Sequence, residues 1–216
     1  MLGQVGVHRQ DPEWMFVAVR LLEGLQLAEA VETLVDEAVS ETLRGGNGMT
    51  IRLYVAACAE RMAPLFVGLR VGEAGREADV DFYAESVRDL WLADRPLLDA
   101  AERVRVVERF PELQPGDEEI TDVFGTYTFF AALVLRYALL ANSTGNPDDA
   151  MSCGHAALTA MGMLDQNVAG AGFRAQEYGL QSVSVSGDVT GLWEASIEAG
   201  RERFRTVLGR TAGSSG

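Results

Sequence analysis

Apolar residues recur at steps of three and four along most of this 216-residue chain, and that spacing constrains its fold more than any other feature. In residues 50–69 they form a single helical stripe, which consists of Ile51, Val55, Cys58, Met62, Leu65 and Leu69. An α-helix repeats every 3.6 residues, whereas a strand needs strict alternation. The periodicity therefore predicts a protein built from packed helices.

Helix start and stop signals divide the chain into segments. Asp11-Pro12 and Asn146-Pro147 each place a capping residue before a proline at the first helical position, and "RGGNG" ends a helix. We predict helices over 11–22, 27–43, 50–69, 79–91, 97–108, 119–141, 147–164 and 188–208. In the last of these the spacing predicts that Trp193, Ile197, Phe204 and Leu208 face inward. Residues 165–187 have no clear pattern, although "SVSVS" alternates like a short strand.

Nowhere do strand patterns alternate with helical ones, which disfavours a parallel sheet. The chain is 48% hydrophobic and 23% charged, as is typical of a folded globular protein. We expect an all-α, single-domain bundle of about seven or eight helices over residues 11–209. A flexible tail over 1–10 and a frayed tail over 210–216 complete this prediction.

The chain is strongly acidic, with 18 basic and 32 acidic residues and a formal charge of -14. Such a charge disfavours binding to nucleic acid and to anionic membranes, and it favours a protein partner with a basic surface. All the basic residues are arginine. Without lysine, Schiff-base chemistry and a P-loop lysine are excluded.

We expect a soluble, cytoplasmic protein. The N-terminal residues contain no uninterrupted apolar segment of the kind that a signal peptide needs. The most apolar stretch, "FFAALVLRYALLA", is interrupted by Arg136 and is too short to span a bilayer. Cys58 and Cys153 lie in apolar helical surroundings, which indicates reduced core residues.

Metal and cofactor motifs are weak. Cys153 and His155 are two residues apart on a helix and point to nearly opposite sides, so they do not make a metal site. "GAGFRA" at 170–175 spells a dinucleotide-binding fingerprint, but no strand precedes it, which favours a loop. No nucleophile motif is present. We expect no catalytic residue, no cofactor and no metal.

Three residues in one helix remain as candidates for a site. Glu60 and Arg61 lie beside the apolar stripe of 50–69, and Pro64 removes a backbone donor one turn later. In one interpretation Arg61 pairs with Glu85 or Asp89 of the next helix and fixes packing. In the other, Glu60, Arg61 and Pro64 line a cleft at a kink and bind a ligand.

Four segments, "ACAERMAPLF", "VRDLWLADRP", "VERFPELQPGDEEITDVFGTYTFFAALVL" and "DDAMSCGHAALTAMGMLDQ", follow in the order of the YjaG-like family of bacterial proteins. The chain resembles this family over about residues 50–208. The family motif ends in Pro-Asn-Tyr, whereas this chain has Pro64-Leu65-Phe66, and residues 8–48 differ from the family. The resemblance implies a compact helical bundle and supplies no established activity.

These observations lead to one expected function and two alternatives. We expect a non-enzymatic protein that binds another protein, in the manner of an immunity protein or antitoxin that masks a basic toxin. The first alternative is a small-molecule binder or enzyme with a pocket near Glu60 and Arg61. The second is a homo-oligomer that buries an apolar face near Trp14 and Phe16.

Overall fold

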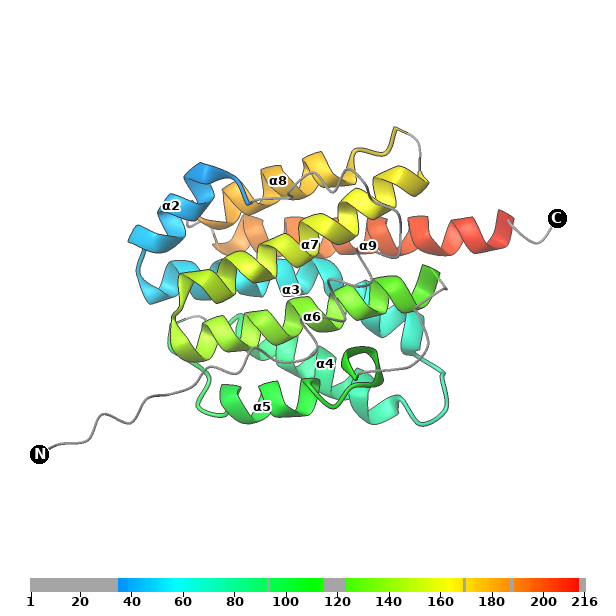
Figure 1. Cartoon of the computed structure of the whole chain (residues 1–216), viewed down its shortest axis with the longest axis horizontal. Coiled ribbons are helices and arrows are strands. Elements are labelled where there is room, and N and C mark those ends of the chain that lie inside the picture. The colour runs from blue at the N-terminus through cyan, green and yellow to red at the C-terminus, as the bar shows by residue number, and fades with distance from the viewer. Residues whose placement is uncertain (1–34, 93, 115–122, 169, 187–188, 214–216) are drawn as a thin grey trace, which may run out of the picture.

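The computed structural model describes residues 35–92, 94–114, 123–168, 170–186 and 189–213, and the described residues fold into an all-α bundle without strands (Figure 1). The predicted tail 1–10, the predicted helix 11–22, and Trp14 and Phe16 lie outside these ranges. The helices are α2 (Glu37–Gly45), α3 (Gly48–Arg70), α4 (Glu77–Leu90), α5 (Ala100–Val107), the 3-10 turn η1 (Pro111–Leu113), α6 (Val123–Thr144), α7 (Pro147–Asn167), α8 (Phe173–Ser184) and α9 (Val189–Gly213).

Helix α3 is the centre of the bundle. It packs against α4, α6, α7, α8 and α9, while α6 and α7 lie side by side in front of it (Figure 1). Every residue from Leu53 to Ala59 is buried, so α3 is enclosed on all sides and not on a single stripe. Side chains on α3 therefore meet partners from several helices.

Helix α6 corresponds to the helix predicted over 119–141, and it is largely buried. Among the described residues it alone is long and apolar enough to cross a membrane, but 61% of its most apolar window is buried inside the bundle. Arg136, which interrupts this stretch, pairs with Glu108 at 2.8 Å. A mostly buried apolar helix is what the core of a soluble bundle requires.

Several predicted boundaries differ from the structure. Asn47 caps α3 by accepting a hydrogen bond from the Thr50 amide at 3.0 Å, so this helix begins before Thr50. The strand predicted from "SVSVS" is wrong, because α8 continues to Ser184. Helix α9 continues past residue 209, where we expected the domain to end, to Gly213.

The inward face of α9 also differs from the prediction. Trp193 and Leu208 are 48% and 41% exposed, although their spacing predicts burial. The buried face of α9 carries small and polar residues together with apolar ones, namely Leu192, Ser196, Ala199, Gly200, Arg203 and Val207. Ile197 and Phe204 are half-buried, and Phe204 packs against the core, so the predicted inward face is correct only in part.

Pro64 lies inside α3 without ending it, and α9 approaches closely at this point. A Cβ atom on Gly200 would lie 3.0 Å from the Arg61 carbonyl oxygen and 3.0 Å from both Cγ and Cδ of Pro64. The absent side chain thus lets the two helix backbones meet. This contact brings the buried face of α9 against the helical turn that carries Arg61.

Candidate functional site

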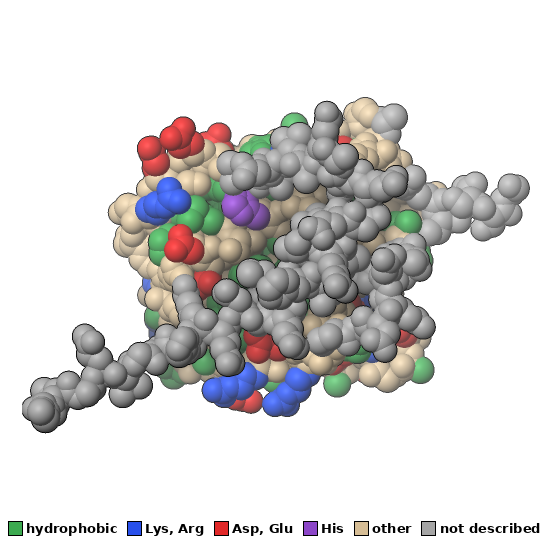
Figure 2. Space-filling model, viewed as in Figure 1, with side chains coloured by type: hydrophobic (Ala, Val, Ile, Leu, Met, Phe, Trp, Pro, Cys, Tyr) green, Lys and Arg blue, Asp and Glu red, His purple; other side chains and the backbone are tan. Residues whose placement is uncertain are grey.

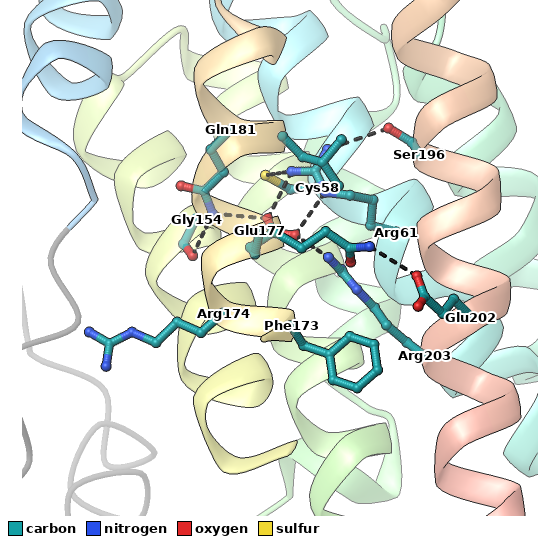
Figure 3. Close-up of polar contacts among 12 residues, drawn as sticks. Cys58, Arg61, Gly154, Phe173, Arg174, Glu177, Gln181, Ser196, Glu202 and Arg203 are labelled. Carbon is teal, nitrogen blue, oxygen red and sulfur yellow. Dashed lines mark hydrogen bonds and ion pairs between the residues drawn. The ribbon is translucent and has the colours of Figure 1, made fainter. Parts of the chain in front are cut away.

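Arg61 is fully buried, and its partner is Glu177 of α8. Arg61 Nε and NH2 donate to Glu177 Oε2 and Oε1 at 2.9 and 2.8 Å, a two-pronged ion pair (Figure 3). The predicted pairing with Glu85 or Asp89 is therefore wrong. Asp89 instead pairs with Arg103 at 2.9 Å.

The guanidinium of Arg61 makes further hydrogen bonds within the chain. NH1 donates to Ser184 Oγ and Ser196 Oγ, both at 3.4 Å, and NH2 donates to Cys58 Sγ at 3.3 Å. Arginine has five N–H donors. Together with the two bonds to Glu177, these contacts use all five, so Arg61 joins α3, α8 and α9 and has no donor left for a ligand.

Glu177 binds a second arginine and a glutamine. Arg203 NH2 of α9 donates to Glu177 Oε2 at 2.7 Å, and Gln181 Nε2 donates to Oε1 at 3.0 Å (Figure 3). We refer to Arg61, Glu177, Gln181 and Arg203 as the buried cluster. All four residues are at most 1% exposed. Buried charges are tolerated only when they are paired and hydrogen-bonded, and this carboxylate meets both conditions.

Gln181 extends the buried cluster to α3 and α7. It accepts a hydrogen bond from the Tyr54 hydroxyl at 2.8 Å, and its Nε2 donates to the Gly154 carbonyl at 3.1 Å. Gly154 has no side chain, and a Cβ there would overlap the Tyr54 hydroxyl. The polar network therefore joins four helices, and it fits only because α7 has a glycine at this position.

The charges of the buried cluster shift its pKa values in different directions. Burial alone would raise the pKa of Glu177, but Arg61 and Arg203 outweigh it and hold this pKa at about 2. Burial would lower the pKa of Arg61, but Glu177 outweighs it and the pKa is raised. The pKa of Arg203 is lowered, because burial and the charge of Arg61 exceed the attraction of Glu177. The single carboxylate thus compensates Arg61 more fully than Arg203.

Acid should destabilise the protein through Glu177. Because the pKa of this carboxyl falls from 4.5 to about 2 on folding, its contribution is complete above about pH 4.5 and is lost as the pH falls towards 2. At about 1.4 kcal/mol per pKa unit, the loss amounts to roughly 3 kcal/mol. Urea unfolding of the wild type and of Glu177→Gln at several pH values measures it. Equal pH slopes in the two proteins would contradict this assignment.

The sequence contains a signal for the α8 half of the cluster. Phe173, Glu177, Gln181 and Ser184 are spaced by four, four and three residues, and all four are buried. This is a helical stripe whose members are mostly polar, so a search for apolar periodicity misses it. Ser196 and Arg203 on α9 were missed for the same reason.

The "GAGFRA" segment, which resembles a dinucleotide-binding fingerprint, forms the start of α8. A side chain of the same protein binds the backbone amides at this helix start. Asp165 at the end of α7 accepts hydrogen bonds from the Phe173 and Arg174 amides at 2.7 and 2.9 Å. In a dinucleotide site a phosphate occupies such a position. Here the Asp165 carboxylate caps α8 and so fixes the register in which Glu177 faces the core.

Glu60 and Pro64 are half-buried, unlike Arg61, so the structure does not bring the three predicted residues into one site. Glu60 accepts a hydrogen bond from Trp91 Nε1 at 2.9 Å. Burial raises the pKa of Glu60, while hydrogen bonds from Trp91 and Trp193 and the charge of Arg201 oppose this rise. We refer to Glu60, Trp91 and Trp193 as the Glu60 surface.

The two cysteines lie in the core beside Arg61, and His155 lies nearer the surface. Cys58 and Cys153 are fully buried, whereas His155 is half-buried, and burial lowers its pKa. Cys153 Sγ donates to the Val134 carbonyl at 3.5 Å, and burial raises the pKa of this thiol. Within the described ranges, no three His, Cys, Asp or Glu residues gather in a way that would hold a metal ion.

Comparison with known proteins finds no matching family model, curated protein or solved structure. The resemblance to the YjaG-like family therefore stays a prediction.

Proposed function

We propose that this chain is a non-enzymatic protein that binds a basic protein partner through the Glu60 surface. The observation that carries the proposal is a carboxylate held beside a partly exposed indole: Trp91 fixes Glu60 at 2.9 Å, and Trp193 is 48% exposed. An exposed tryptophan on a folded bundle is unusual, because burial of its large ring is favourable. Tryptophan is also enriched among the residues that dominate protein interfaces.

This arrangement suits an arginine or lysine side chain. A carboxylate accepts up to about four hydrogen bonds, so Glu60 retains lone pairs beyond those that the indoles occupy. A guanidinium can pair with a carboxylate in two-pronged fashion and stack on the face of an indole. Leu92, which follows Trp91 in the chain, is 59% exposed, and Val189, one helical turn before Trp193, is 37% exposed. Both add exposed apolar area.

The charge of the chain supports a basic partner. The formal charge is -14, and Glu194 and Glu198 are exposed on the same helix as Trp193. Acidic side chains also gather over α2 on the face shown in Figure 2, where Glu37 and Glu41 are exposed. Such a field accelerates encounter with a positively charged protein and is screened by salt. In its most specific form, the partner is a basic toxin that this chain masks in the cytoplasm.

The alternative of a small-molecule pocket near Glu60 and Arg61 has less support. Arg61 points into the core and donates all five of its hydrogen bonds within the chain. Glu60 points away from it, towards Trp91. The two residues therefore do not converge on a common ligand.

The proposal is tested by affinity capture from native cells with three versions of the chain: wild type, Trp193→Ala and Leu208→Ala. Leu208 is a matched control, because it is 41% exposed and lies near the other end of α9. We expect a basic protein that wild type and Leu208→Ala retain and Trp193→Ala loses. With the purified partner, Trp193→Ala should weaken binding by about 2 kcal/mol.

Salt provides the second arm of this experiment. Association of the purified pair should slow steeply as sodium chloride is raised, and Glu60→Gln should reduce that dependence. Capture of the same proteins by all three versions, or an association rate that salt does not change, would contradict the proposal.

A further inference from the structure

Helix α6 is apolar on nearly every side, and the described helices cover only part of it. Arg136 is its only charged residue. A helix that is apolar all round belongs in the interior of a protein, where neighbours cover each of its faces. Only 61% of the most apolar window of α6 is buried, so the rest of this window reaches the surface. This part of α6 therefore needs a further apolar partner.

Apolar residues form a stripe on the outward side of α6. We refer to Phe130, Leu133, Tyr137 and Leu140, which are spaced by three, four and three residues, as the α6 stripe. On the inward side, Thr128 accepts a hydrogen bond from Arg70 of α3 at 2.9 Å. At 3.6 residues per turn, each stripe residue lies about 120° to 180° around the helix from Thr128. The stripe thus faces away from α3, and Figure 1 shows α6 at the front of the described bundle.

The chain carries a matching apolar face before its first described residue. In the helix predicted over 11–22, the spacing i, i+3, i+4, i+7 and i+8 of an amphipathic helix is followed by Trp14, Val17, Ala18, Leu21 and Leu22. Phe16 and Arg20 fall on the other side of this helix. Such a helix is about 18 Å long, and the α6 stripe from Phe130 to Leu140 is about 15 Å long. The two apolar faces therefore match in length.

The path of the chain starts this segment beside the stripe. Val35, the first described residue, is 5% exposed, and its Cγ2 atom lies 3.0 Å from the position of a Cβ on Gly154 of α7. The preceding segment therefore begins at α7, which packs against α6 (Figure 1). Even as a helix, residues 23–34 would span about 18 Å, whereas neighbouring helices lie about 8–10 Å apart. A tether this short gives a roughly millimolar effective concentration, which favours this segment over a separate molecule.

We propose that residues 11–22 pack as an amphipathic helix on the α6 stripe of the same molecule. The face that carries Trp14 then covers the side of α6 that the described helices leave open. A second copy of the chain would offer the same apolar face, but it lacks the tether. The formal charge of -14 disfavours an anionic membrane as the occupant. Other helices form the Glu60 surface, so this contact is independent of the proposed function.

Limited proteolysis of the full chain with trypsin tests this packing. Trypsin cleaves after arginine; Arg20 lies within the proposed helix, whereas Arg9 lies in the predicted tail and is the internal control. Cleavage after Arg20 requires that the segment leaves the bundle and unfolds locally. In the wild type we expect this cleavage to be at least about tenfold slower than cleavage after Arg9. Mass spectrometry at early time points gives both rates.

Two pairs of variants locate the contact. Val17→Asp places a charge on the proposed contact face and should remove the protection of Arg20. Phe16→Asp is its matched control, because it places the same charge at the neighbouring position on the other face, and it should keep the protection. On the bundle, Leu140→Asp should remove the protection, whereas Leu208→Asp, at a residue of α9 that is 41% exposed, should keep it. Circular dichroism checks that each variant is folded, and Phe130→Ser replaces Leu140→Asp should the latter not fold.

Three results would overturn the proposal. In the first, trypsin cleaves the wild type after Arg20 as fast as after Arg9. In the second, the protection survives the substitution in the α6 stripe, which would mean that the segment packs on another face. In the third, sedimentation shows a dimer that Val17→Asp dissociates, which would mean that a second copy covers the stripe. A monomer whose protection is lost on substitution of either face supports the proposal.

Discussion

Replacement of Glu177 by glutamine is expected to destabilise the protein by about 3 to 5 kcal/mol, a large part of the stability of a typical domain. The substitution leaves Arg61 and Arg203 buried against a neutral amide, whose nitrogen cannot accept a hydrogen bond from either of them. Urea unfolding at pH 7 measures the loss. Glu202→Gln is the control, because this exposed acid accepts one hydrogen bond from Gln176, and its effect should stay within about 0.5 kcal/mol.

A triple variant separates the charge effect from packing. When Arg61 and Arg203 become methionine together with Glu177→Leu, no charge remains in the buried cluster, and apolar groups of similar volume fill the space. Replacement of a whole buried ion cluster in this way is often neutral or stabilising. We therefore expect the triple variant to recover most of the stability that Glu177→Gln loses. If the triple variant is as unstable as the single one, the loss stems from packing and not from charge.

Gly154→Ala is expected to cost about 2 to 6 kcal/mol. The new methyl group would overlap the Tyr54 hydroxyl and lie 3.0 Å from Gln181 Oε1 and from Val35 Cγ2. Overpacking of a core costs about 1 to 3 kcal/mol. Displacement of Tyr54 would also break the hydrogen bond from its hydroxyl to the Gln181 amide oxygen. Two buried polar groups would then lack a partner, at a further cost of about 1 to 3 kcal/mol.

Gly179→Ala is the matched control for this substitution. Gly179 lies inside α8, is exposed, and has no atom within 4 Å of the position of a new Cβ. Because alanine favours the helix over glycine, this variant should be more stable by about 0.5 to 1 kcal/mol. Thermal unfolding of the two variants gives the comparison. If Gly154→Ala also stabilised the protein, the close packing of α7 against Tyr54 would be contradicted.

The helices could be predicted from the sequence because their signals are local. The helix over 50–69 and the Asn146-Pro147 start both appear in the structure, as does the buried helix around residues 123–144. The partner of Arg61 could not be predicted, because Glu177 is 116 residues away and no local spacing connects them.

The inward faces of α8 and α9 were missed for a different physical reason. Periodicity identifies a core by its apolar residues, and here the core carries Glu177, Gln181 and Arg203. Arg203 and Gln181 both donate to the Glu177 carboxylate, so their burial is a property of the group and not of any single residue. The exposure of Trp193 follows from the same arrangement, because the helix turns its polar side inward.

The two buried thiols allow separation of the helices to be measured in the native protein. Cys58 and Cys153 are 0% exposed, on α3 and α7. A thiol reagent can label them only in molecules whose helices have separated, so the labelling rate under native conditions measures the free energy of that separation. A comparison of this rate with global unfolding would show whether the bundle opens as one unit or loosens first around its charged centre.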